Sequence, residues 1–316
     1  MRSKKIWVVG IICAMNIYAD EWQQTGNLNT GRYVAQAILL DNGKVLITGG
    51  NHGGNSCEIY DPSTGTWTYA ASMAQARWYH TMVKLQNGKI LVIGGDDTLV
   101  GMQPLKSCEI YDPNTNTWTL TDSLNRARIE PSAVVLQNGK VLVTGGMDGL
   151  TPVPECEIYD PQTGTWSYTS PYPSGRFGHT LTLLPNGNVL STGGTTLWSG
   201  PADTRIYEVS TGTWRTTGEL NVKRDHHTAT TLDNGKILVV GGMNESGAAT
   251  SVCEIFDPAT ETWSITGSLS YARHAHQTVK LLDGRVITIA GYGTTFLSSC
   301  EIYNPQTGQW SPTAPL

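Results

Sequence analysis

The fold of this chain is decided by residues 77–118, which read RWYHTMVKLQNGKILVIGGDDTLVGMQPLKSCEIYDPNTNTW. Three short apolar runs rich in Val, Ile and Tyr lie between turn residues, a pattern typical of strands rather than helices. Asn87-Gly88 predicts a tight hairpin with a type I′ turn, because both residue types tolerate positive φ. Asp112-Pro113 predicts a second turn, into a fourth strand. One copy of this stretch therefore predicts a small four-stranded antiparallel sheet.

The stretch recurs along the chain. A glycine pair ends the second run in five copies and an Ala-Gly pair ends it in a sixth, at intervals of 45 to 51 residues: Gly49-Gly50, Gly94-Gly95, Gly145-Gly146, Gly193-Gly194, Gly241-Gly242 and Ala290-Gly291. Every copy also keeps a Trp after its last turn: Trp67, Trp118, Trp166, Trp214, Trp263 and Trp310. A lone four-stranded sheet leaves both faces uncovered, so stacking the copies around a ring is the available way to bury them.

A glycine pair, a Tyr-Asp-Pro turn and a Trp at a period near 50 residues resemble the kelch repeat. The resemblance covers residues 32–316. It implies an all-β fold, a six-bladed kelch-type β-propeller of four-stranded antiparallel blades, with one repeat in each blade. No linker, composition shift or charge run divides residues 20–316, so we expect them to form a single domain.

Residues 1–19 have the pattern of a signal peptide. Arg2, Lys4 and Lys5 precede an apolar run over residues 6–15, and Ala19 is a plausible cleavage end. The run is too short for a membrane anchor. We therefore expect an exported protein, periplasmic or extracellular. Its net charge of −5 and the lack of a basic run argue against nucleic acid and anionic membranes as partners.

The cysteines and the repeated basic residues are expected to be structural. Five cysteines directly precede Glu-Ile in the third run: Cys57, Cys108, Cys156, Cys253 and Cys300. Equivalent positions of face-packed blades are about 10 Å apart, too far for a disulfide, so we expect free buried thiols. An Arg begins each copy and a His follows three residues later in four copies, as in Arg77 and His80. We expect the Arg residues to bind backbone carbonyls and the His residues to form hydrogen bonds, with no metal site, because repeat-equivalent ligands do not converge on one point.

Ligand binding is expected where the copies differ. In a four-stranded antiparallel blade the loops before the first strand and after the second emerge at the same end, and loops on a rigid scaffold carry function. The candidate binding residues of this variable face are Tyr33, Trp78, Tyr79, Glu130, Phe177, Trp198, Asp225, His226, His274 and Tyr292. Aromatic side chains with scattered carboxylates resemble a surface that binds a carbohydrate or a protein or peptide. The alternative interpretation is that they only plug and cap the centre of the ring.

No motif indicates catalysis. The sequence has no Gly-x-Ser-x-Gly, phosphate loop or His-Glu-x-x-His. Galactose oxidase and its relatives have a similar propeller, but their copper site uses a Cys crosslinked to a Tyr, and every cysteine of the repeats here occupies a packing position. Periplasmic sialic acid mutarotases are a closer resemblance. They imply an alternative in which Glu130 or Asp225 acts as acid or base beside Arg128 or Arg224. The leading hypothesis is a binding module with no catalytic residues and no cofactor.

Two segments compete for the outer strand of the sixth sheet. Trp310 and Trp22 each open a seven-residue pattern that ends in Leu. Contiguity favours the strand of Trp310, because a local turn costs less loop-closure entropy than a contact that spans the chain. We therefore expect the strand of Trp310 to fill the outer position and residues 20–28 to pack peripherally near it.

Overall fold

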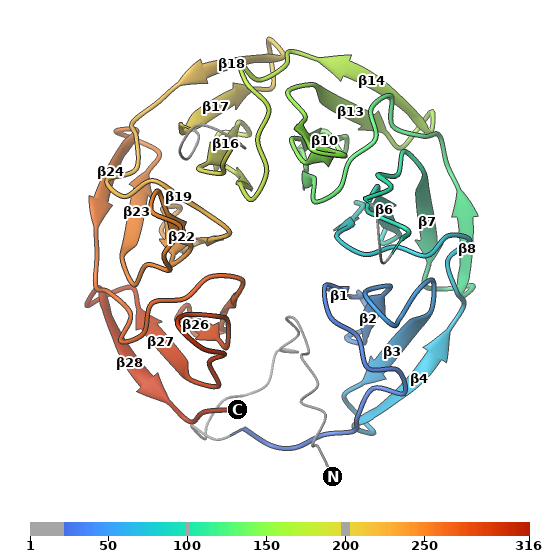
Figure 1. Ribbon diagram of the computed structural model, residues 1–316, viewed down its shortest axis with the longest axis horizontal. Helices are drawn as coiled ribbons and strands as arrows, with labels where there is room; N and C mark the ends of the chain where they lie inside the picture. Colours follow the sequence, from blue (N-terminus) through green and yellow to red (C-terminus); the bar gives the residue numbers. More distant parts are fainter. Residues whose placement is uncertain (1–21, 99–101, 197–202) are drawn as a thin grey trace. The chain divides into compact units, whose positions relative to one another are not determined.

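The structure, a computed structural model, describes residues 22–98, 102–196 and 203–316 (Figure 1). The expected signal peptide, residues 1–19, lies outside this range. The described residues form strands, turns and loops, and they include no helix that could span a bilayer. Six four-stranded antiparallel sheets make the chain an all-β, six-bladed β-propeller, as the repeat predicts.

The chain divides into two compact units of three blades each. Unit 1 contains the described part of Gln24–Thr169, and unit 2 contains residues 22–23 with the described part of Ser170–Leu316. Unit 1 consists of blade 1, β1 (Gln36–Leu39), β2 (Val45–Thr48), β3 (Cys57–Asp61) and β4 (Thr66–Ala70); blade 2, β5 (Thr81–Lys84), β6 (Ile90–Ile93), β7 (Cys108–Asp112) and β8 (Thr117–Leu120); and blade 3, β9 (Ser132–Val135), β10 (Val141–Thr144), β13 (Cys156–Asp160) and β14 (Thr165–Thr169).

Unit 2 repeats the arrangement. It consists of blade 4, β15 (Thr180–Leu183), β16 (Val189–Thr192), β17 (Arg205–Glu208) and β18 (Thr213–Thr216); blade 5, β20 (Thr228–Thr231), β21 (Ile237–Val240), β23 (Cys253–Asp257) and β24 (Thr262–Ile265); and blade 6, β25 (Gln277–Lys280), β26 (Val286–Ile289), β27 (Cys300–Asn304) and β28 (Gln309–Thr313). Two short pairs extend the loops: β11 (Met147–Asp148) with β12 (Thr151–Pro152), and β19 (Arg224–Asp225) with β22 (Met243–Asn244).

The hairpin between the first two strands of each blade forms as predicted, but the predicted turn type is wrong. In blade 2 the N–H of Leu85 donates to the Lys89 oxygen, so the loop has three residues rather than two. Gly88 has a φ of 79°, whereas Asn87 does not adopt positive φ. This is a type I turn followed by a left-handed glycine. Asn87 contributes its side chain instead, because its Oδ1 accepts the N–H of Lys89 at 3.1 Å.

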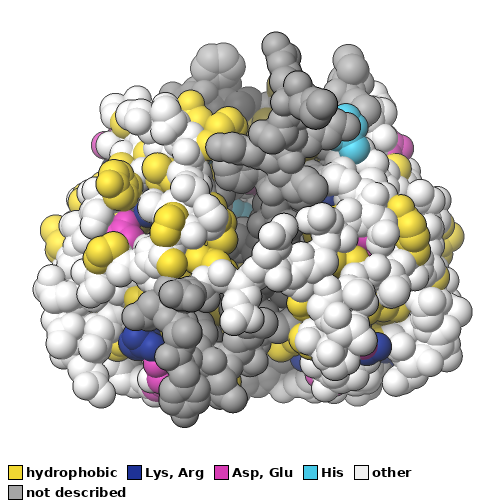
Figure 2. Space-filling view, turned by 90° about the horizontal axis from the view of Figure 1, so that it is seen from below, with side chains coloured by type: hydrophobic (Ala, Val, Ile, Leu, Met, Phe, Trp, Pro, Cys, Tyr) yellow, Lys and Arg dark blue, Asp and Glu magenta, His cyan; other side chains and the backbone are white. Residues whose placement is uncertain are grey.

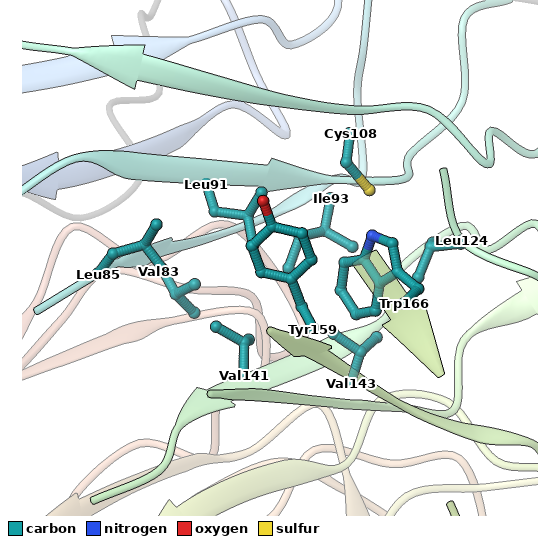
Figure 3. Close-up of a cluster of buried hydrophobic side chains, with 10 residues drawn as sticks. All are labelled: Val83, Leu85, Leu91, Ile93, Cys108, Leu124, Val141, Val143, Tyr159 and Trp166. Atoms are coloured by element: carbon teal, nitrogen blue, oxygen red, sulfur yellow. The ribbon is translucent and has the colours of Figure 1, made fainter. Parts of the chain in front are cut away.

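The core lies between neighbouring blades of a unit. The second strand is buried along its whole length in blades 1 to 5, as in β6 and β10, and over its first three residues in blade 6. Figure 3 shows side chains of blade 2 packing against those of blade 3 in one cluster: Val83, Leu85, Leu91, Ile93, Cys108, Leu124, Val141, Val143, Tyr159 and Trp166. Each blade thus covers the face that a lone sheet would leave open.

The cysteines lie inside these layers, and their expected state is confirmed. All five described cysteines are free and buried. Burial raises the pKa of Cys57 and of Cys108 to about 12, so neither is a thiolate near neutral pH.

The outer strand of the last blade is the expected one, but the expectation that residues 20–28 pack peripherally near it is wrong for Leu28, which is buried against Ala35 and Ile47 of blade 1. β28, which contains Trp310, pairs with β27 as the outer strand of its sheet. Trp22, the first described residue, donates from Nε1 to the Ala314 oxygen at 2.8 Å, just beyond β28. The described residues before blade 1 form no strand, so the strand of Trp310 takes the outer position.

Candidate functional site

The Arg that begins each repeat holds the loops of its own blade. Arg77 is buried, and its Nη1 donates to the backbone oxygens of Gly94 at 2.9 Å and Ser107 at 2.8 Å. These bonds confirm the expected role as a carbonyl ligand. Its Nη2 also lies 2.8 Å from a carboxylate oxygen of Glu109, a fully buried residue of β7. Sequence reasoning missed this ion pair, which recurs in the other blades.

The carboxylate also holds the incoming chain. Glu109 accepts the backbone N–H of Ala74 at 2.7 Å, so one side chain fixes the loop before the Arg and the Arg itself. The glutamates with this role are Glu58, Glu109, Glu157, Glu254 and Glu301. In blade 4, where Arg205 stands at the Glu position, Asp203 binds Arg176 at 2.8 Å instead. The sequence did offer a signal for this ion pair, namely the Glu that follows the repeated Cys inside an otherwise apolar strand. A repeated buried Arg needs a partner of opposite charge, and this Glu is such a residue.

These Arg–Glu ion pairs, called ties below, correct the expectation for Arg128 and Arg224. Arg128 and Arg224 were proposed as partners for a substrate carboxylate beside Glu130 and Asp225. Both guanidinium groups are buried and paired, Arg128 with Glu157 and Arg224 with Glu254. A ligand on the loops cannot reach them unless the ties break.

The repeat histidines are structural, as expected. Nε2 of His80 lies 2.8 Å from Thr48 Oγ1 of the preceding blade, and Nε2 of His276 lies 3.0 Å from Thr228 Oγ1. Burial and the charge of Arg77 lower the pKa of His80 to about 3, and burial with Arg273 lowers that of His276 to about 3. Both imidazoles are therefore neutral near pH 7.

The two residues after each Arg form the variable end of a blade. The first bridges to the loop after the glycine pair: Tyr33 with Asn51, Trp78 with Asp96, Ile129 with Met147, Phe177 with Thr195, Asp225 with Met243 and His274 with Tyr292. The second has positive φ in every blade: Val34, Tyr79, Glu130, Gly178, His226 and Ala275. The bridges confirm that both kinds of loop emerge at the same end of each blade.

In unit 1 this end brings four predicted residues together. The ring centroids of Trp78 and Tyr79 are 5.3 Å apart. The backbone N–H of Glu130 donates to the backbone oxygen of Tyr79 at 2.8 Å. Tyr33 is 43% exposed and Tyr79 is 37% exposed. Burial raises the pKa of Tyr79, and the nearby Glu130 and Tyr33 add to the effect. Three aromatic side chains and a carboxylate therefore share one surface of unit 1.

In unit 2 the corresponding end holds an acid–imidazole pair. Asp225 is buried, and its Oδ1 lies 2.6 Å from His226 Nδ1. A Cβ at Gly178 would lie 2.9 Å from the His226 ring, so the imidazole rests against this glycine. Phe177 meets the same ring edge to face, with centroids 6.1 Å apart. The Asp225 carboxylate fixes the orientation of the His226 ring.

A second aromatic group lies in blade 6. Tyr292 packs edge to face against His274, with centroids 5.6 Å apart, and against Phe296, at 5.1 Å. Burial and the neighbouring His226 lower the pKa of His274, while Asp225 opposes the shift. His274 is thus close to the Asp225–His226 pair. The remaining predicted residue, Trp198, lies outside the described residues.

Charged side chains near these loops include two exposed or partly exposed ion pairs, Arg126 with Asp148 at 2.8 Å and Lys223 with Glu245 at 3.5 Å. On the side of the molecule that Figure 2 shows, the described Lys and Arg side chains stand singly rather than in a patch. Residues 22–98, 102–196 and 203–316 contain no group of three or more His, Cys, Asp or Glu side chains placed to hold a metal ion.

Comparisons with known proteins agree with the repeat pattern. Residues 10–194 match the model of the KLHDC2/KLHL20/DRC7 Kelch-repeats domain, and residues 226–270 and 275–316 match the Kelch motif. No curated protein matches the chain.

Solved structures with a similar fold include a novel fungal alcohol oxidase of the AA5 family in complex with copper. It is 21% identical with a TM-score of 0.74, and the match covers 90% of this chain and 65% of the oxidase. Another is YjhT, 15% identical with a TM-score of 0.71, where the match covers 90% of this chain and 97% of YjhT. The chain thus spans about two thirds of the oxidase, and at these identities the likeness shows the fold alone.

Proposed function

The chain belongs to the Kelch-repeat family, and we propose that it is a binding module whose variable loops bind a carbohydrate. The supporting observation is a set of partly exposed aromatic rings on loops that buried ion pairs hold in place. In unit 1 these are Tyr33 and Tyr79, and in unit 2 they are Tyr292 and Phe296. No other blade has a Tyr, Trp or Phe at the position of Tyr79, so the repeat does not need this ring.

The chemistry of these loops suits a sugar. An aromatic ring offers a flat apolar face, and hydroxyl, carboxylate and imidazole groups beside it offer hydrogen bonds. A pyranose presents the complement, an apolar C–H face with a rim of hydroxyls. A peptide that adds as a strand needs an unpaired strand edge. Here the backbone beside Tyr33 and Trp78 already forms bridges to the neighbouring loop.

A glycan array followed by titration tests this proposal. We expect saturable binding of at least one oligosaccharide, and a loss of about tenfold or more in affinity when Tyr33→Ala and Tyr79→Ala are combined. Tyr69→Ala is the matched control, since Tyr69 is 61% exposed but lies on the outer strand β4. Binding of peptides alone, or equal losses for Tyr69→Ala and the double variant, would contradict the proposal.

A second candidate is a sugar-active enzyme, which the Asp225–His226 pair favours. A carboxylate that orients an imidazole is a common arrangement for proton transfer. Exchange between the anomers of a bound sugar, followed by NMR, distinguishes the two functions. Acceleration that Asp225→Asn removes would indicate the enzyme. Saturable binding without acceleration would indicate the module.

We also propose that the protein is exported, on the strength of the basic residues and apolar run in residues 1–19. The intact mass of protein recovered from a secreting host tests this. Loss of about the first 19 residues supports export, whereas a full-length intracellular product contradicts it.

A further inference from the structure

We propose that the surface formed by Tyr33, Trp78, Tyr79 and Glu130 binds a positively charged amino group on the carbohydrate ligand. The inference rests on the proposed function and adds a ligand class to it, namely amino sugars with free amines. All four residues belong to unit 1 and come from the variable ends of its three successive blades.

The first argument is the ring arrangement. The Trp78 and Tyr79 rings are 5.3 Å apart and tilted by 42°, so they present adjoining faces at an angle rather than a single stack. Tyr33 adds a third ring, packed edge to face on His52 at 6.2 Å. An ammonium group is attracted to the electron-rich face of such rings, with the strongest attraction where water is partly excluded.

The second argument is charge. The residues that follow the three arginines of unit 1 include one carboxylate, Glu130, and no Lys or Arg. The arginines that precede Trp78 and Glu130 are Arg77 and Arg128, which are buried and paired with their own glutamates. Among these residues an anionic sugar would therefore meet a carboxylate and no cation. An aminated sugar would meet a carboxylate of opposite charge.

The third argument is that the surface is preorganised. Tyr79 and Glu130 both have left-handed backbone, with φ of 52° and 56°. The hydrogen bond from Glu130 N–H to the backbone oxygen of Tyr79 links the two blades at this point. The backbone segments that carry the ring and the carboxylate are thus held beside each other before any ligand arrives, which lowers the entropy cost of binding.

The test compares two oligosaccharides of equal length, fully deacetylated chitotetraose and its N-acetylated form, by calorimetric titration at about pH 6. We expect the amine form to bind the protein at least about tenfold more tightly. Glu130→Gln should remove most of this preference and leave affinity for the acetylated form nearly unchanged. Added salt should weaken the binding of the amine form and leave the binding of the acetylated form unchanged.

The control variant is Asp122→Asn, which removes the same charge from an exposed residue on the loop that leads into blade 3. It should keep the preference. Equal affinity for the two forms would overturn the inference and leave the carbohydrate proposal intact. Binding of neither form, with tight binding of a lysine peptide, would overturn both. Loss of the preference in Asp122→Asn as well as Glu130→Gln would show only bulk charge attraction and would also overturn the inference.

Discussion

At the scale of single residues, the buried arginines hold the loops in place through hydrogen bonds and ion pairs. Arg77 has four partners in its own blade: two backbone carbonyls, the Ser107 hydroxyl and the Glu109 carboxylate. A buried charge is costly unless it is paired and hydrogen-bonded, so removal of one partner leaves the other charge uncompensated.

Arg77→Met should therefore destabilise the protein by about 3–5 kcal/mol, because Glu109 would remain buried without its cation. Lys89→Met is the control, since Lys89 and Asp112 form an exposed pair at 3.0 Å, and it should cost about 0–1 kcal/mol. Urea unfolding of both variants provides the measurement. Equal costs would show that the tie adds nothing beyond an ordinary surface pair.

Acid should weaken the protein through its buried imidazoles. The pKa of His80 is lowered from 6.5 to about 3, so between these values the unfolded chain binds a proton that the folded chain excludes. Stability is thus fully present above about pH 6.5 and falls as the pH decreases towards 3. His80→Gln keeps a hydrogen-bonding group near Thr48 but cannot titrate. As the pH decreases from about 7 to 5, the free energy of unfolding should fall less for this variant than for the wild type. Parallel curves would exclude His80 as a contributor.

The residue scale also shows where sequence reasoning succeeds and fails. The repeated Arg, His and Cys were correctly predicted to be structural, because a residue that recurs in most or all copies serves the scaffold. The role of Glu109 was missed because its partner Arg77 lies 32 positions away in the sequence, and only the folded blade brings the two together. The pairing of Asp225 with His226 was also missed, since sequence alone indicates neither the side-chain orientations nor the left-handed backbone of His226, a non-glycine residue.

At the scale of elements, the glycine pairs allow close approach between blades. A Cβ at Gly49 would lie 2.2 Å from the backbone oxygen of Arg77, in the next blade.

The hairpin turns use glycine for its positive φ instead. Position and spacing predicted the hairpins, but the choice between two and three loop residues depends on strand twist and register. The turn type was therefore wrong although the strands were right.

Gly49→Ala and Gly54→Ala separate the two effects of glycine. Both residues have a φ of 59°, but a Cβ at Gly54 would meet no atom within 4 Å. Both variants place a Cβ on left-handed backbone, and only Gly49→Ala adds a clash with backbone. We expect Gly54→Ala to cost about 1 kcal/mol and Gly49→Ala clearly more. Thermal melting of the two proteins side by side provides the comparison. A similar decrease in Tm for both would mean that the blades separate easily at this point.

At the scale of the whole molecule, the number of blades and their strand order followed from the repeat, because turns and glycine pairs cannot shift without breaking the sheets. The end of the chain was also correctly predicted. β28 pairs with β27 at five positions, whereas Trp22 makes one side-chain hydrogen bond to Ala314. What the loops bind could not be predicted in the same way, since their residues occur once and follow no period.

Deletion of residues 309–316 should therefore lower the Tm more than deletion of residues 20–28. The first deletion removes a complete outer strand and exposes the Tyr303 ring that packs 5.2 Å from Trp310. The second removes the contacts of Trp22 with Ala314 and of Gly26 with Gly65, together with Leu28, which is buried against Ala35 and Ile47 of blade 1 but contributes no strand. Differential scanning calorimetry of both truncated proteins would decide the order. The opposite ranking would mean that the N-terminal segment closes the fold.

The ties between Arg and Glu have a consequence for how such a protein can change over generations. Each tie is completed within one repeat, as Arg32 with Glu58 and Arg273 with Glu301 show. A gene duplication or recombination that moves one repeat therefore carries both loops and the side chains that fix them. New specificities can arise by exchange of whole repeats, and the same exchange offers protein engineers a way to combine loops from different relatives.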